Sequence, residues 1–153
     1  MSEITKMEEF LQKLTPCIER GDLDACVEEA ARVAQEMGVG AGELLDLSRQ
    51  EGGMEGKNDF AYVLALAAAQ GLKGEAKAGA YCNAGIASHD AGNIEKAEDY
   101  YRKAIEANPK LEAVHSNYAS LLSECNRKNE AEDHYRKAIE ANPKYAMAHY
   151  NYA

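Results

Sequence analysis

Hydrophobic residues recur at helical spacing along the chain, and glycine or proline separates one amphipathic run from the next. Between residues 94 and 105 one set of apolar residues, Ile94, Ala97, Tyr101, Ala104 and Ile105, recurs at intervals of three, four, three and one. Such intervals put side chains on one face of an α-helix. Glu98 and Arg102 form an acid-first pair on the opposite face, which is typical of a solvated surface. We predict one helix with a narrow buried stripe.

Glycine and proline mark where the predicted helices end. The run at residues 80–91 stops at Gly92, a residue type that tolerates the left-handed conformation of a helix stop. Pro109 biases the residue before it away from helical angles and so ends the run that begins at Ile94. Further runs cover residues 4–14, 22–37, 41–50 and 60–70. Pro16 is expected to start a new turn after the first of these runs.

The run at residues 60–70 is apolar on all sides but much shorter than a bilayer-spanning helix. A helix of this kind must be covered on most of its surface. We predict that it lies buried between an N-terminal helical hairpin and the second half of the chain.

One phrase occurs twice in the sequence, thirty-four residues apart. AEDYYRKAIEANPK begins at Ala97 and AEDHYRKAIEANPK begins at Ala131, so that only Tyr100 and His134 differ. Likewise, HSNYA at residues 115–119 returns as HYNYA at residues 149–153. Each period holds two predicted helices, and self-similarity at a fixed period predicts a solenoid of stacked helix pairs.

The repeated unit resembles the tetratricopeptide repeat, because the characteristic residues of that repeat occupy fixed positions in the period. In the first unit they are Tyr81, Gly85, Gly92, Ala97, Tyr101, Ala104 and Pro109; in the second they are His115, Ala119, Asn126, Ala131, Tyr135, Ala138 and Pro143. His115 and Asn126 depart from the usual aromatic residue and glycine. The resemblance implies an all-α fold, an α-α superhelix of antiparallel helix pairs, in which these residues and Tyr118 pack the repeats together.

The chain is expected to have two regions. Residues 1–74 form an N-terminal helical region, and residues 75–153 form the repeat region, with repeats at 78–111 and 112–145 and a partial repeat at 146–153. The third repeat breaks off after eight positions, so we expect a piece of a longer protein whose end can stack on a partner or a second copy. If Gly21 is aligned with Gly92, then the characteristic positions of the repeat are occupied by Phe10, Leu14, Ala30 and Val33. Whether residues 1–74 are degenerate repeats stays open.

The resemblance also implies that the first helix of each repeat lines a concave groove. Asn83, Asn117 and Asn151 occupy the same groove-facing place in successive repeats. An amide offers one acceptor and two donors, so a series of them can hold a peptide main chain. The alternative is that asparagine is common at this place without any ligand. The expected groove neighbours are small or mildly apolar: Gly79, Cys82, Ile86, Ala113, Ser116 and Ser120.

Chaperone-tail binders of this family hold a terminal carboxylate with lysine, arginine and asparagine at set places of the groove. Cys82, Ile86, Met147 and Asn151 occupy those places in this sequence. We therefore expect no lysine or arginine in the groove. An acidic C-terminal tail is disfavoured as a ligand, and an extended uncharged or basic segment is expected instead.

Charge and motifs exclude several classes of function. The net charge of −9, with no basic cluster, disfavours nucleic acid and anionic membranes. The charged start MSEITKMEEF is not a signal peptide. No nucleotide-binding or catalytic motif occurs, so we expect neither an enzyme nor a cofactor.

Histidines and cysteines do not form a metal site in the sequence. The four histidines lack ligand spacing, and His115 is assigned to packing and His134 to an exposed helix face. Cys17, Cys26, Cys82 and Cys125 show no CxxC pairing, and we expect reduced thiols in a cytoplasmic protein.

We predict an interaction scaffold that binds a partner peptide or protein through the concave groove. The alternative is a self-assembling module whose repeats stack end to end, with the N-terminal helices filling the groove and no peptide ligand. The identity of the partner is not encoded in a readable form.

Overall fold

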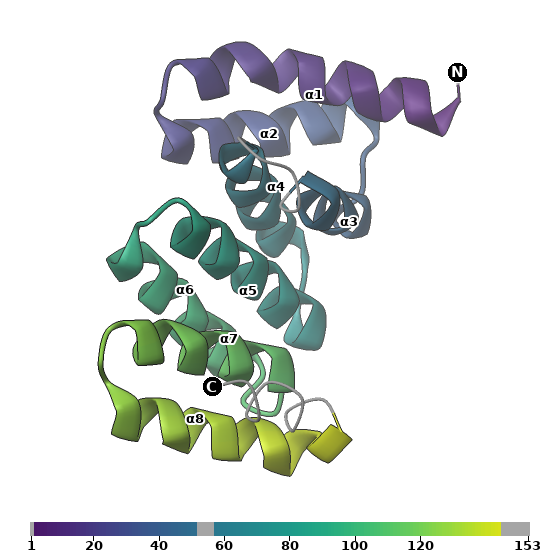
Figure 1. The fold of residues 1–153 in the computed structure, drawn as a ribbon. Coiled ribbons are helices and arrows are strands. Elements are labelled where there is room, and N and C mark those ends of the chain that lie inside the picture. Colours follow the sequence, from purple (N-terminus) through teal and green to yellow (C-terminus); the bar gives the residue numbers. More distant parts are fainter. Residues whose placement is uncertain (1, 52–56, 145–153) are drawn as a thin grey trace.

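The computed structural model describes residues 2–51 and 57–144, and in this part of the chain it consists of α-helices without strands (Figure 1). The helices are α1 (Glu3–Glu19), α2 (Leu23–Met37), α3 (Ala41–Glu51), α4 (Asn58–Gly71), α5 (Gly74–Asp90), α6 (Ile94–Ala107), α7 (Glu112–Glu124) and α8 (Lys128–Ala141). Successive helices pack as pairs, and the pairs stack along one axis. The all-α prediction is confirmed.

Helix α4 connects the two halves of the molecule. It packs against α2 and α3 on one side and against α5 on the other, as its apolar sequence predicts. Its buried side chains include Tyr62, Val63 and Leu64. One hydrophobic core extends from α1 to α5 and a second extends from α5 to α8, with Tyr81 packed against both.

The two repeat hairpins turn in the same way although their turn residues differ. Gly92 and Asn126 both have a positive φ, 79° and 60°. The amide N–H of the next residue donates to the carbonyl five positions back in each case, Asn93 to Ser88 and Arg127 to Leu122, both at 2.9 Å. Asparagine is the residue that best replaces glycine in a left-handed helix stop, so the same cap forms twice.

Small residues and tyrosines pack each hairpin. Tyr101 is fully buried and lies against Gly85, where an added Cβ would stand only 2.7 Å from the ring. The structure also buries Ala97, Ala104, Tyr118, Ala119, Ala131, Tyr135 and Ala138, whereas Tyr81 is half-buried. Gly92 and Pro109 are exposed at turns, and Pro143 is exposed two residues after the end of α8. Close approach of the helices therefore depends on the absence of a side chain at Gly85.

Two sequence predictions were wrong: that Pro16 starts a new turn, and that the side chain of Ile94 is buried. Pro16 does not start a new turn, because α1 runs through it to Glu19. Leu14 and Cys17, on either side of Pro16, are buried, and their packing holds the helix continuous. Ile94 is 37% exposed rather than buried, because it is the first residue of α6 and lies beyond the stripe.

The prediction of four reduced cysteines was also wrong for one pair. Cys17 and Cys26 form a disulfide between α1 and α2, with their Cα atoms 5.7 Å apart. The turn at Gly21 reverses the chain and brings the two buried residues within disulfide range. This pairing depends on the hairpin and has no CxxC signature. Cys82 and Cys125 are free thiols.

Candidate functional site

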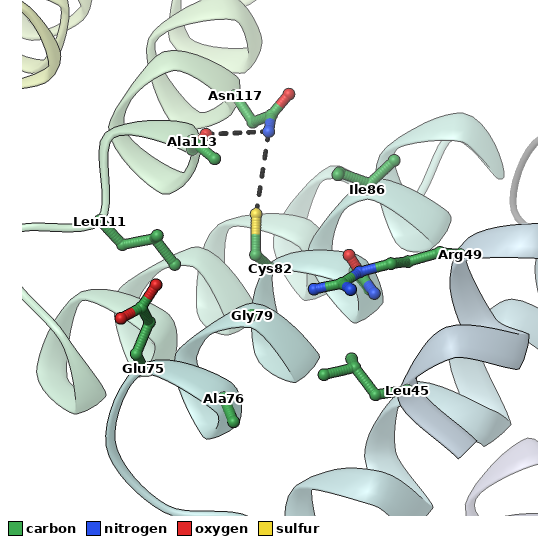
Figure 2. Close-up of a pocket in the computed structure, with 11 residues that line it drawn as sticks. Leu45, Arg49, Glu75, Ala76, Gly79, Cys82, Ile86, Leu111, Ala113 and Asn117 are labelled. Atoms are coloured by element: carbon green, nitrogen blue, oxygen red, sulfur yellow. Dashed lines mark hydrogen bonds between the residues drawn. The ribbon is translucent and has the colours of Figure 1, made fainter. Parts of the chain in front are cut away.

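A groove of about 550 Å³ lies between α3, α5 and α7 (Figure 2). Its walls come from three helix pairs, since α3 precedes the repeats and α5 and α7 are the first helices of the two repeats. The lining residues are Leu45, Arg49, Glu75, Ala76, Gly79, Cys82, Asn83, Ile86, Leu111, Ala113 and Asn117. The mixture of aliphatic side chains and a few polar groups is typical of a ligand site.

The orientation of Asn83 is fixed by α3. The Asn83 amide Nδ2 donates to Ser48 Oγ at 3.0 Å. The Ser48 hydroxyl in turn donates to the Leu45 carbonyl at 2.7 Å, and Ser48 is fully buried. This chain of hydrogen bonds links the first repeat to the N-terminal half and directs the amide nitrogen of Asn83 toward Ser48.

The orientation of Asn117 is fixed by α7 and α5. Its Nδ2 donates to the Ala113 carbonyl at 2.8 Å and to Cys82 Sγ at 3.8 Å. Figure 2 shows the amide nitrogen directed toward both groups and the carbonyl oxygen turned away from them. Burial raises the pKa of the Cys82 thiol to about 11, although Asn117 and the charge of Arg49 act in the opposite direction. The thiol therefore stays protonated at neutral pH and is a poor nucleophile.

The two asparagines thus offer their carbonyl oxygens to the groove as acceptors, while their amide nitrogens donate within the protein. Within the described residues neither Oδ1 atom accepts a hydrogen bond, whereas both Nδ2 groups are engaged within the protein. Each fixed amide carbonyl can accept from the N–H of a peptide main chain without reorienting.

The prediction that the groove holds no lysine or arginine was wrong. Arg49 lines the groove from α3, and Figure 2 shows its side chain reaching toward α5. A methyl group on Gly79 would lie 3.7 Å from Arg49 Nη2. Glu75, at the start of α5, supplies a negative charge to the same groove. Family positions cover only the repeats, so they could not show a cation that comes from α3.

The sequence-predicted groove residues separate into two sets. Asn83, Asn117 and Ile86 line the groove together, as do the expected neighbours Gly79, Cys82 and Ala113. Ser116 is buried, and its Oγ has no hydrogen-bond partner among the described residues; Ser120 is half-buried, and neither serine lines this groove. Asn151 lies outside the described residues.

Sequence reasoning missed Leu45, Arg49, Glu75, Ala76 and Leu111. Leu45 and Arg49 are four residues apart and so lie on one face of α3. That spacing is visible in the sequence, but it does not show which helix the face meets.

A second polar cluster joins α7 and α8. His115 Nδ1 lies 3.0 Å from His134 Nδ1, and the rings stack with centroids 5.3 Å apart. His115 Nε2 donates to the Pro109 carbonyl at 2.7 Å. His134 is therefore half-buried rather than on an exposed face, because it packs on His115 and Tyr118. Burial, and then the charge of His115, lowers the pKa of His134 to about 4.

Two further features of the described residues bear on function. In residues 2–51 and 57–144 no group of three or more His, Cys, Asp or Glu side chains could hold a metal ion. Over the same residues, no helix has the length and apolar character that crossing a membrane requires.

Comparison with models of protein families matches two stretches of the chain, residues 78–111 and residues 113–145, both described as tetratricopeptide repeat. No curated protein matches the chain. Repeats of this kind generally mediate protein–protein interactions, and proteins built from them are typically non-catalytic scaffolds. The resemblance seen in the sequence is confirmed for the second half of the chain: residues 78–111 and 113–145 are tetratricopeptide repeats.

Proposed function

We propose that the groove between α3, α5 and α7 binds an extended segment of a partner protein and that the role is non-catalytic. The observation that carries this proposal is the pair of fixed amides, Asn83 and Asn117, which line a groove of about 550 Å³ and whose carbonyl oxygens accept no hydrogen bond from the described residues. A peptide lying along α5 and α7 would present N–H groups to these oxygens. Leu45, Ile86 and Leu111 would contact its apolar side chains.

Two features favour groove binding over the filled-groove alternative. The N-terminal helix α3 forms one wall of the groove and leaves the cavity open, rather than occupying it. The buried Cys82 thiol and the hydrogen bonds of Ser48 pre-order the groove, so little conformational entropy is lost on binding.

A cytoplasmic location remains a prediction, and the Cys17–Cys26 disulfide, a bond typical of oxidising compartments, argues against it.

A selection from a phage-displayed library of random dodecapeptides tests the proposal. Wild-type protein is compared with Gly79→Gln, which puts a neutral side chain into the groove. Gly42→Gln is the matched control, because Gly42 is an exposed glycine of α3 with no atom near its added Cβ. We expect peptides to enrich on the wild type and on Gly42→Gln but not on Gly79→Gln. Equal enrichment on all three proteins would contradict groove binding.

The asparagines are tested with one enriched peptide. Replacing Asn83 and Asn117 together by alanine removes two neutral acceptors, so we expect its affinity to fall about tenfold in a fluorescence anisotropy titration. An unchanged affinity would remove the amides from the proposed contact. Light scattering over a concentration series covers the self-assembly alternative: association of the wild type without any peptide enrichment would favour it.

A further inference from the structure

Arg49 gives the groove a charged group that the repeats themselves do not supply. Of the described residues that line the groove, Arg49 is the only basic one. It belongs to α3, which lies outside both family matches. Recognition by this residue would therefore be particular to this chain rather than a property of its repeats.

The guanidinium of Arg49 is available to a ligand. Among the described residues it pairs with Asp46 Oδ1 at 3.4 Å, and both side chains are more than half exposed, 57% and 70%. A long, exposed ion pair of this kind contributes little. A carboxylate brought into the groove can form a two-pronged, charge-assisted contact, which is shorter and stronger than the pair with Asp46.

The position of Arg49 indicates an acidic side chain rather than a chain terminus. Arg49 lies beside Gly79 in the middle of the groove's α5 wall. That wall continues one turn back to Glu75 and one turn onward to Asn83. A ligand main chain therefore has groove on both sides of Arg49, as an internal residue requires and a C-terminal carboxylate does not.

The other charges limit the number of acidic residues in the ligand. Glu75 lines the same groove and repels a second carboxylate while attracting a lysine or arginine. The net charge of −9 also opposes the approach of a strongly acidic segment. The complementary partner has one acidic residue and a basic residue toward the Glu75 end.

We propose that the groove selects an extended partner segment with one internal Asp or Glu facing Arg49 and a Lys or Arg on the Glu75 side. This inference rests on the proposed function, because it names the ligand of the same groove. It differs from the expectation of an extended uncharged or basic segment, which followed from the repeat positions alone.

Repeating the dodecapeptide selection on Arg49→Glu tests the inference. We expect the wild type to enrich peptides with one recurrent internal Asp or Glu, and Arg49→Glu to enrich peptides with Lys or Arg at that place. An enriched wild-type peptide is then synthesised with its acidic residue as Glu, Gln and Lys, each with a free and an amidated C-terminus. For the wild-type protein we expect the Lys peptide to bind at least about tenfold more weakly than the Glu peptide in an anisotropy titration. For the Arg49→Glu protein we expect the Lys peptide to regain its affinity. Circular dichroism checks that the variant is folded.

The outcomes separate the two proposals. If no peptide enriches on the wild type over Gly79→Gln, both groove binding and this inference fail. If peptides enrich but show no acidic preference, or the Lys peptide does not recover on Arg49→Glu, groove binding stands and the role of Arg49 is overturned. If affinity depends on the free C-terminus instead of the internal residue, the ligand is a terminal carboxylate and the inference is wrong.

Discussion

The two repeat hairpins, α5–α6 and α7–α8, have the same backbone arrangement but carry different pairs of aromatic rings at equivalent positions. Tyr81 and Tyr100 stack in the first hairpin with ring centroids 6.2 Å apart, and His115 and His134 stack at the same places in the second at 5.3 Å. A pair of flat rings is therefore what the packing requires at these places. What the rings contact beyond each other differs between the hairpins.

The tyrosine pair binds the first hairpin to the helices before it. The Tyr100 hydroxyl lies 3.0 Å from that of Tyr62 in α4, which donates to Asp24 of α2. The ammonium groups of Lys77 and Lys103 lie over the two stacked rings. Burial raises the pKa of Tyr62 well above its usual value of 10, so this tyrosine stays neutral near pH 7.

The histidine pair is bound within its own hairpin and to the turn before it. The Pro109 carbonyl accepts from His115 Nε2, so a neutral His115 presents an unprotonated Nδ1 that accepts from His134. Only one of the two facing nitrogens can carry a hydrogen. Equivalent repeat positions can therefore hold either a tyrosine pair linked to a neighbouring helix or a histidine pair held within the hairpin, with the fold unchanged.

The largest expected difference between the hairpins concerns the residue that faces the buried tyrosine. Gly85→Ala places a methyl group 2.7 Å from the ring of the fully buried Tyr101, so we expect a loss of about 1–3 kcal/mol in the free energy of unfolding. Ala119→Gly, the reverse change in α7, should cost about 1 kcal/mol through helix propensity. Urea denaturation measures both.

A rescue experiment sharpens that prediction. In a Tyr101→Leu background the ring is absent, so Gly85→Ala should cost less than it does in the wild type, and the double-mutant cycle should show coupling. Additive effects of the two changes would mean that the contact between Gly85 and Tyr101 does not determine the packing.

The next difference is the response to acid. Because the pKa of His134 falls from 6.5 to about 4 on folding, the unfolded chain binds more protons between these values. The stability contributed by neutral His134 is fully present above about pH 6.5 and is lost as the pH falls toward 4. Lys137 and His115 oppose the charged form, whereas Asp133 and Glu130 favour it. After discounting for partial exposure we expect a loss of about 1–2 kcal/mol.

The matched variant for this prediction is His134→Tyr, which places in the second hairpin the residue type that the first hairpin has at the equivalent position, Tyr100. Urea denaturation at pH 7 and at pH 4.5 should show a smaller loss of stability in the variant than in the wild type. An identical pH dependence in both proteins would contradict the lowered pKa of His134 as the cause of the acid response.

The smallest expected effect concerns the hydroxyl of Tyr101. It is buried without a hydrogen-bond partner among the described residues, and burial raises the pKa of Tyr101 well above its usual value. Removing an unsatisfied buried polar group is neutral or favourable, so Tyr101→Phe should leave stability unchanged or raise it by up to about 1 kcal/mol. A clear loss in thermal unfolding would indicate an ordered partner such as a buried water.

The sequence predicts the repeats well because their packing is local and periodic. Ala97, Tyr101 and Ala104 fall on one helix face, and a fixed period repeats that face. Contacts between the repeats and the N-terminal half cannot be read in this way. The Cys17–Cys26 bond, the Ser48–Asn83 hydrogen bond and the entry of Arg49 into the groove all depend on how α1 to α4 pack. The stacking of His134 on His115 joins residues on different helices and has no local pattern.

The most direct test of groove binding is a titration of ¹⁵N-labelled protein with an enriched dodecapeptide, followed by amide chemical shifts. We predict that the largest changes occur at Gly79 and at the side-chain amides of Asn83 and Asn117, and that Glu132 and Arg136 on the outer face of α8 stay unchanged. Changes centred on α8, or none in the groove at saturating peptide, would contradict the proposal that this protein binds its partner between α3, α5 and α7.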